Sequence, residues 1–363
     1  MKNRIRVITV AAVWAVLAVW AWLAPSRDIS VAERRQLAQK PAIQGKKLLD
    51  GSFMTDFEDA SLDQFPLRDT FREAKSLFHR FVLRQSDKSG IYISQGYAAA
   101  QEYPLSEASV NHALERFSSV YETYLSSTDS RIYLAIVPDK GFYLAQSAGQ
   151  LSLDYDRLFA MVEGGMPWAS PIRLTDSLSI QDYYRTDTHW RQETLGETAA
   201  AIAAAMGASL PAEYETVDVS SAFRGVYAGQ YALPVEPDAL RYLTNGTIAS
   251  LRVYNYETGA EIPVYDLTLA AGRDGYEMFL GGTKALLTIE NPNAETDREL
   301  VIFRDSFGSS IAPLLAQGYA KVTVVDIRYM APALAGRFVD LSQADDVLFL
   351  YSTGVLNHSE TIQ

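Results

Sequence analysis

Three polar residues, split between two distant blocks of the sequence, are the strongest candidates for chemistry. Asp187 and His189 lie two residues apart in Asp-Thr-His-Trp (187–190), and Ser306 lies far downstream in Phe-Arg-Asp-Ser-Phe-Gly (303–308). A serine hydroxyl is a weak nucleophile until an adjacent base takes its proton. The residue types therefore predict a serine triad, with His189 as the base and Asp187 holding its tautomer.

The elements around Ser306 favour this role. A short apolar run at 300–303 predicts a buried strand, and a helix is predicted from about 309 to 317. Ser306 would then lie at the carboxyl edge of a strand and at a helix N-terminus, where free N–H groups stabilise an oxyanion. The Ser306 N–H is the first candidate donor. Asp187 and His189 precede an Ala-rich helix predicted at 192–206.

The residues alone leave other interpretations open. Asp305 and Ser306 are both favoured N-cap residues, so this pair could serve only to cap the following helix. Asp187 and Thr188 could likewise cap the helix after Trp190. A metal site at Asp187 and His189 is disfavoured because no further cluster of ligands accompanies them.

Alternation of strands and helices predicts an α/β fold. Near-continuous apolar runs at 131–138, 300–303, 321–326 and 346–351 are separated by helical stretches, which is typical of parallel strands buried on both faces. The segment from about 210 to 298 is rich in Tyr, Thr, Val and Gly at short spacing. We expect a β-rich insertion there.

The N-terminus predicts a membrane segment. Lys2, Arg4 and Arg6 precede an uninterrupted apolar run at 7–24, which spans roughly 27 Å as a helix. The basic side predicts a cytoplasmic N-terminus and an extracytoplasmic body. An uncleaved anchor is favoured over a cleaved signal peptide because no small-x-small site follows the run. The predicted organisation is a cytoplasmic tail at 1–6, a transmembrane anchor at 7–24, a helical connector at 25–89 and a catalytic domain at 90–363.

Composition excludes several classes of protein. The 363 residues carry a formal net charge of −12 and include no cysteine. An acidic body argues against nucleic-acid binding, which needs a basic footprint. Without cysteine there is no disulfide, no thiolate nucleophile and no Cys–zinc site. The sequence predicts neither a cofactor nor a metal.

The two blocks resemble those of a known family. Asp-Thr-His-Trp (187–190) followed by Phe-Arg-Asp-Ser-Phe-Gly (303–308) is similar to the DHHW family of bacterial envelope proteins and to the AlgJ/AlgX-type acetyltransferases of alginate O-acetylation. Thr188 stands where the DHHW name has a second His. Supporting segments are Val137–Lys140, Tyr276–Gly282, Val325–Tyr329 and Leu348–Ser352. The resemblance implies an SGNH-hydrolase-like three-layer α/β/α fold in which the Asp-x-His block precedes the serine.

Further residues are candidates for the oxyanion hole or for substrate binding. They are Gly282, Arg304, Tyr329, Ser352, Asn357 and Trp190. Gly281 and Gly282 could bring backbone near the substrate, although a β-turn explains them equally well. Tyr184, Trp190 and Tyr329 could stack on sugar rings, but each such residue type is more often part of a core.

The resemblance implies a membrane-anchored, extracytoplasmic O-acetyltransferase that moves an acetyl group through Ser306 to hydroxyls of a cell-envelope or exopolysaccharide. It also implies a multi-spanning membrane acyltransferase as the partner that delivers the acetyl group. A carbohydrate acetylesterase with the same triad is the alternative enzyme, because only the acceptor differs. A non-catalytic envelope protein that binds polysaccharide is the third hypothesis.

Overall fold

The apolar runs that predict buried strands form the centre of an eight-stranded sheet in the computed structural model, which describes residues 2–30, 32–232 and 235–363. The strand order is β11-β10-β12-β14-β13-β15-β6-β7. From β14 to β7 the neighbours are parallel, whereas β12, β10 and β11 add antiparallel strands at one edge. The bounds are β6 (Arg131–Val137), β7 (Ser170–Ile172), β10 (Arg252–Asn255), β11 (Ala260–Ile262), β12 (Leu286–Glu290), β13 (Glu299–Arg304), β14 (Lys321–Val325) and β15 (Asp346–Ser352).

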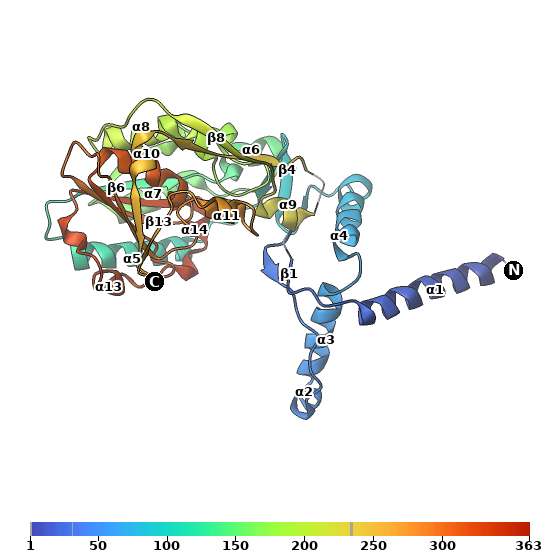
Figure 1. The fold of residues 1–363 in the computed structure, drawn as a ribbon. Coiled ribbons are helices and arrows are strands. Elements are labelled where there is room, and N and C mark those ends of the chain that lie inside the picture. The colour runs from blue at the N-terminus through green and yellow to red at the C-terminus, as the bar shows by residue number, and fades with distance from the viewer. Residues whose placement is uncertain (1, 31, 233–234) are drawn as a thin grey trace. The chain divides into compact units, whose positions relative to one another are not determined.

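Helices cover both faces of this sheet, so the predicted three-layer α/β/α fold is confirmed (Figure 1). Alternate residues of each central strand point to opposite faces. Ile302 of β13 packs with α8 and α12 on one face, while Val301 and Phe303 pack with α5 and α7 on the other. The helices of this body are α5 (Glu107–Val120), α6 (Lys140–Ala148), α7 (Tyr155–Gly165), α8 (Gly196–Ala205), α10 (Gly246–Ser250), α11 (Leu267–Ala270), α12 (Gly308–Leu315), α13 (Pro332–Ala335) and α14 (Thr353–Asn357).

The predicted β-rich segment at 210–298 divides between two sheets. β8 (Glu215–Phe223) and β9 (Asp238–Thr244) form a two-stranded sheet of their own. By contrast, β10, β11 and β12 extend the main sheet, with β12 pairing antiparallel to β14. β4 (Ile91–Ser94) and β5 (Tyr97–Ala100) form an antiparallel hairpin.

The chain divides into two units, residues 1–89 with 228–234 and residues 90–227 with 235–363. The first unit contains α1 (Lys2–Leu23), β1 (Ile29–Ser30), β2 (Arg35–Gln36), α2 (Gly45–Leu49), α3 (Ser52–Asp63), α4 (Arg68–Leu77), a π-helical turn (Phe78–Val82) and β3 (Asp87–Lys88). The chain passes between the units within α9 (Val226–Tyr231). Residues 2–6 of the predicted cytoplasmic tail form the first part of α1. Met1 lies outside the described residues.

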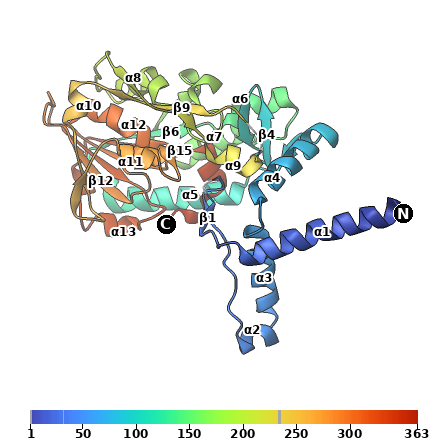
Figure 2. The same ribbon diagram turned by 45° about the vertical axis from the view of Figure 1, so that its right-hand side comes forward.

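Among the described residues, one helix is long and apolar enough to span a membrane, Asn3–Leu23. Within the first unit, both ribbon views show α3 running crosswise to α1 (Figures 1 and 2).

Candidate active site

Asp187, His189 and Ser306 lie together in a continuous hydrogen-bonded chain. The distance from His189 Nε2 to Ser306 Oγ is 2.8 Å, and that from His189 Nδ1 to Asp187 Oδ1 is 2.6 Å. Asp187 is fully buried and His189 is nearly so, whereas Ser306 is partly exposed between buried neighbours. The arrangement gives a hydroxyl with a base on one side and solvent access on the other, which is the geometry of an activated nucleophile.

The turn that presents Ser306 is held by the carboxylate before it. Asp305 Oδ1 accepts the Phe307 N–H at 3.0 Å, and its Oδ2 accepts the Ser352 N–H at 2.7 Å. The helix-capping role considered for Asp305 and Ser306 is therefore filled by Asp305 alone. The Ser306 hydroxyl is left to hydrogen-bond with His189. Position 308 requires glycine, because a Cβ there would lie only 2.5 Å from the Cβ of Arg304.

Asp187 is fixed through both of its carboxylate oxygens. Oδ1 also accepts the His189 backbone N–H at 3.1 Å, which closes an Asx-type turn within the Asp-x-His block. Oδ2 accepts the Val226 N–H at 3.0 Å. These bonds replace the helix-capping role considered for Asp187. The sequence offered no signal for Val226, because this contact joins residues 39 positions apart.

A tyrosine that the sequence did not assign to the site covers the imidazole of His189. The Tyr276 ring stacks on it with centroids 3.8 Å apart and planes 7° apart. Its hydroxyl donates to Ser310 Oγ at 2.8 Å, and Ser310 Oγ also accepts the Trp190 Nε1–H at 2.7 Å. Burial raises the pKa of Tyr276, so its hydroxyl stays protonated and remains a donor. The only sequence signal was the Tyr276–Gly282 segment of the family resemblance.

Buried polar groups hold the segment just before Asp187. The Lys140 ammonium donates to the Tyr184 carbonyl at 3.0 Å, and burial lowers the pKa of Lys140 to about 7. The carboxylate of Asp238 accepts the Arg185 and Thr186 N–H groups, each at 2.8 Å. Two separate elements therefore anchor the backbone that leads into the Asp-x-His block.

Four other predicted residues have structural partners instead of a position facing substrate. Trp190 and Tyr184 are fully buried, so neither ring can stack on a sugar. Arg304 is buried in an ion pair with Asp326 at 3.2 Å. Asn357 Oδ1 accepts the Ser106 N–H at 2.7 Å, a bond that fixes the start of α5.

The remaining oxyanion and binding candidates differ in their placement. Gly282 adopts φ +76° and donates its N–H to the Phe279 carbonyl at 3.1 Å, so it belongs to a turn and its donor is used. The Ser352 N–H is already donated to Asp305 Oδ2. Tyr329 is 53% exposed, with the Arg328 guanidinium 5.3 Å from its ring centroid. Within the part of the chain that the structure describes, the Ser306 N–H has no hydrogen-bond partner, so it is available to an oxyanion.

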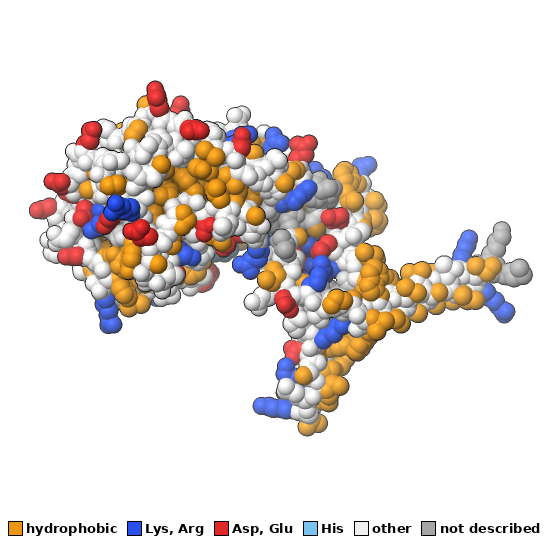
Figure 3. Space-filling model, viewed as in Figure 1, with side chains coloured by type: hydrophobic (Ala, Val, Ile, Leu, Met, Phe, Trp, Pro, Cys, Tyr) orange, Lys and Arg blue, Asp and Glu red, His pale blue; other side chains and the backbone are white. Residues whose placement is uncertain are grey.

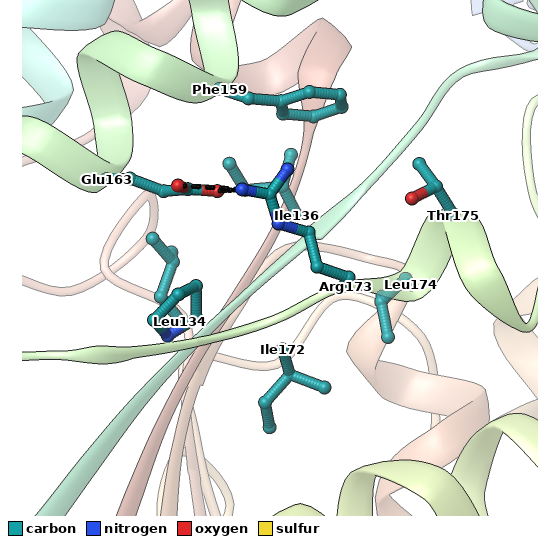
Figure 4. Close-up of a pocket in the computed structure, with 9 residues that line it drawn as sticks. Leu134, Ile136, Phe159, Glu163, Ile172, Arg173, Leu174 and Thr175 are labelled. Carbon is teal, nitrogen blue, oxygen red and sulfur yellow. Dashed lines mark hydrogen bonds and ion pairs between the residues drawn. The ribbon is translucent and has the colours of Figure 1, made fainter.

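A cavity of about 20 Å³ lies beside β6 and β7, away from the triad. Its lining includes Leu134, Phe159 and Ile172, and the ion pair between Arg173 and Glu163 crosses it (Figure 4). That volume holds about one water molecule, so this cavity does not accommodate an acyl or sugar group.

The stacked tyrosine gives a testable expectation. Replacing Tyr276 by leucine removes the ring face that orients the imidazole, so we expect kcat to fall about tenfold with little change in KM. Tyr276→Phe keeps the ring and loses one hydrogen bond, so it should retain most of kcat. Steady-state kinetics on both variants, alongside their melting temperatures, make the measurement. Equal losses in the two variants would assign the effect to the hydroxyl.

Comparison with known proteins supports the fold. No protein-family model matches the chain, and no curated protein matches it. A DHHW family protein from Eubacterium siraeum superposes with a TM-score of 0.61 and 20% identity, over 76% of this chain and 95% of its own. Bacillus cereus PatB1 with a sulfonyl adduct gives 0.60 and 19%, over 73% and 95%. The O-acetyltransferase domain of Pseudomonas putida AlgJ gives 0.44 and 15%, over 74% and 92%. The DHHW family protein and PatB1 thus share the fold of this chain.

Proposed function

We propose that the protein is a membrane-anchored, extracytoplasmic serine O-acetyltransferase that acetylates hydroxyls of a cell-envelope or exopolysaccharide. The observation that carries the proposal is the hydrogen-bonded chain from Asp187 through His189 to Ser306, with distances of 2.6 and 2.8 Å. The Asp-Thr-His-Trp and Asp-Ser blocks, together with the fold shared with a DHHW family protein, support the acyl-transfer chemistry.

The first half-reaction loads the enzyme. Ser306 Oγ attacks the acetyl carbonyl of the donor while His189 Nε2 takes its proton, and Asp187 stabilises the imidazolium that forms. The negative charge on the carbonyl oxygen is stabilised by the Ser306 N–H, which then has a partner. The bond to the leaving group breaks, the leaving group takes the proton from His189, and acetyl-Ser306 remains.

The second half-reaction reverses these roles. A sugar hydroxyl gives its proton to His189 and attacks the acetyl-Ser306 carbonyl, the bond to Ser306 Oγ breaks, and Ser306 takes the proton back. Water in place of the sugar would make the protein an esterase. Because the acetyl group must reach the outer side of the membrane, the proposal includes a multi-spanning acyltransferase as the donor partner.

An acceptor assay on the full-length chain in detergent tests the proposal. We expect an activated acetyl ester to acetylate Ser306 and then an added oligosaccharide, with ester appearing on the sugar. Acetyl release to water alone, unchanged by the oligosaccharide, would identify an esterase. If the wild-type chain released acetyl no faster than Ser306→Ala and no acetylated sugar formed, both the acetyltransferase and the esterase would be rejected. The non-catalytic polysaccharide-binding protein would then remain. Mass spectrometry of the protein and the sugar distinguishes these outcomes.

A further inference from the structure

An apolar groove of about 300 Å³ lies within the first unit, between the outer end of α1 and the helix α3. Ala18, Ala21 and Trp22 of α1 line one side. Phe53 and Phe57 of α3 line the other. The rest of the lining is Lys40, Pro41, Ile43, Ala60, Ser61, Gln64 and Phe65. The α1 side belongs to the apolar stretch that would cross a membrane. Because α1 forms one side of the groove, an α1 that spans a membrane would place the groove within the bilayer.

A ring contact joins α1 to α3, and hydrogen bonds tie residues beside these helices to the end of α1 and to the residue after α3. Lys40 Nζ donates to the carbonyls of Ala21 and Trp22 at 3.1 and 3.3 Å, which satisfies acceptors left free at the helix C-terminus. The Trp22 and Phe57 rings lie 6.2 Å apart. Gln64, just after α3, accepts the Arg27 N–H and donates to the Arg27 carbonyl, each at 2.9 Å. These contacts place α3 at the level where α1 ends.

The α2–α3 segment, residues 45–63, exposes large apolar side chains. Leu49 is 92% exposed, and Met54 and Leu62 are each more than half exposed. Just before the segment, Ile43 is also mostly exposed. Figure 3 shows hydrophobic side chains running from α1 onto this part of the first unit without a break. In water such a continuous apolar surface is unfavourable, whereas in lipid it costs nothing.

The charges of the same segment point to the kind of surface that it fits. Lys46 and Lys47 are outnumbered by the acidic residues Asp50, Asp56, Glu58, Asp59 and Asp63. A net negative helix is not attracted to anionic headgroups. Its affinity for a bilayer must come from apolar insertion, and that needs no anionic lipid.

We propose that the α2–α3 segment lies in the plane of the outer leaflet and that the groove between α1 and α3 takes a phospholipid acyl chain. The inference rests on the membrane anchorage proposed above and is independent of the chemistry at Ser306. Both ribbon views have α3 crosswise to α1, so an α1 that follows the membrane normal sets α3 near the membrane plane (Figures 1 and 2). The connector then acts as a second membrane contact.

The absence of cysteine allows single nitroxide labels to be placed on the full-length chain. We would label Met54→Cys and Leu49→Cys on the apolar side, and Asp59→Cys as the matched control on the same helix as Met54. In phosphatidylcholine vesicles, oxygen should broaden the signals at positions 49 and 54 more than a water-soluble nickel chelate does. The order should be reversed at position 59. High salt should leave the pattern unchanged.

A fourth label, Val13→Cys in the middle of α1, separates this inference from the proposed anchorage. Protection from the nickel chelate at position 13 with free access at 49 and 54 would overturn the inference while keeping the anchor. Access at all four positions would reject the anchor as well. Insertion at 49 and 54 only with anionic vesicles would replace apolar insertion by headgroup binding, contrary to the proposal. A photoactivatable acyl chain should cross-link within residues 41–65, and its failure to do so would reject lipid in the groove.

Discussion

Replacing Ser306 by alanine is expected to lower the acetyl-transfer rate by at least about 10³-fold, because the hydroxyl that carries the acetyl group is lost. The His189–Asp187 pair does not depend on this hydroxyl, and Ser306 is partly exposed, so the melting temperature should change little. The rate is measured as acetyl ester formed on an oligosaccharide by the full-length chain.

A second reagent checks the same residue without turnover. A sulfonyl fluoride should modify the wild-type chain once and leave Ser306→Ala unmodified, with the mass shift confined to the peptide containing 303–308. The matched control is Ser309→Ala, since Ser309 is a buried serine three residues away on α12. Wild-type rates in Ser306→Ala would remove the nucleophile from the proposal, as would sulfonylation at another serine.

Gly225→Ala is expected to reduce both activity and stability, although residue 225 lies outside the triad. A Cβ at position 225 would lie 2.4 Å from the Asp187 Cα and 2.5 Å from the Asp187 backbone nitrogen. Since backbone cannot yield as a flexible side chain does, Asp187 must move. A displacement of about 1 Å costs a catalytic group on the order of 10²-fold in rate. Overpacking of this kind also destabilises by about 1–3 kcal/mol.

Gly246→Ala is the matched control for this substitution. Nothing lies within 4 Å of a Cβ there, and the residue begins the short helix α10. It should keep the wild-type rate and melting temperature. If Gly225→Ala behaved like Gly246→Ala in both kinetics and thermal unfolding, Asp187 would not depend on this close contact.

The two candidate catalytic blocks and the central strands were predictable because their signals are local. Each central strand is a short apolar run, and the Asp-x-His block places a carboxylate beside an imidazole within three residues. The parallel part of the sheet followed from alternation with helices. The antiparallel edge of β10, β11 and β12 did not, because the residue pattern of a strand does not specify which sheet it joins or in which direction it runs.

The support of the site was not predictable, because it comes from contacts between distant segments. The Val226 N–H on Asp187 and the Tyr276 ring on His189 each depend on how a loop folds back over the Asp-x-His block. The partners of the candidates Arg304, Ser352 and Asn357 were not predictable for a related reason. The Arg304 and Asn357 side chains and the Ser352 backbone N–H each have a partner that only the tertiary structure supplies.

The order of the strands in the main sheet determines how late in synthesis the candidate triad can assemble. β15, close to the C-terminus, inserts between β13 and β6, and its pairing with β6 joins residues more than 200 positions apart. Such non-local pairing forms late in folding. On the proposed topology the N-terminus stays at the membrane while the rest of the chain crosses, so His189 reaches the outside well before Ser306. On that topology the Ser306 hydroxyl and His189 can meet only after most of residues 90–363 have crossed, and a shorter nascent fragment would lack the complete candidate triad.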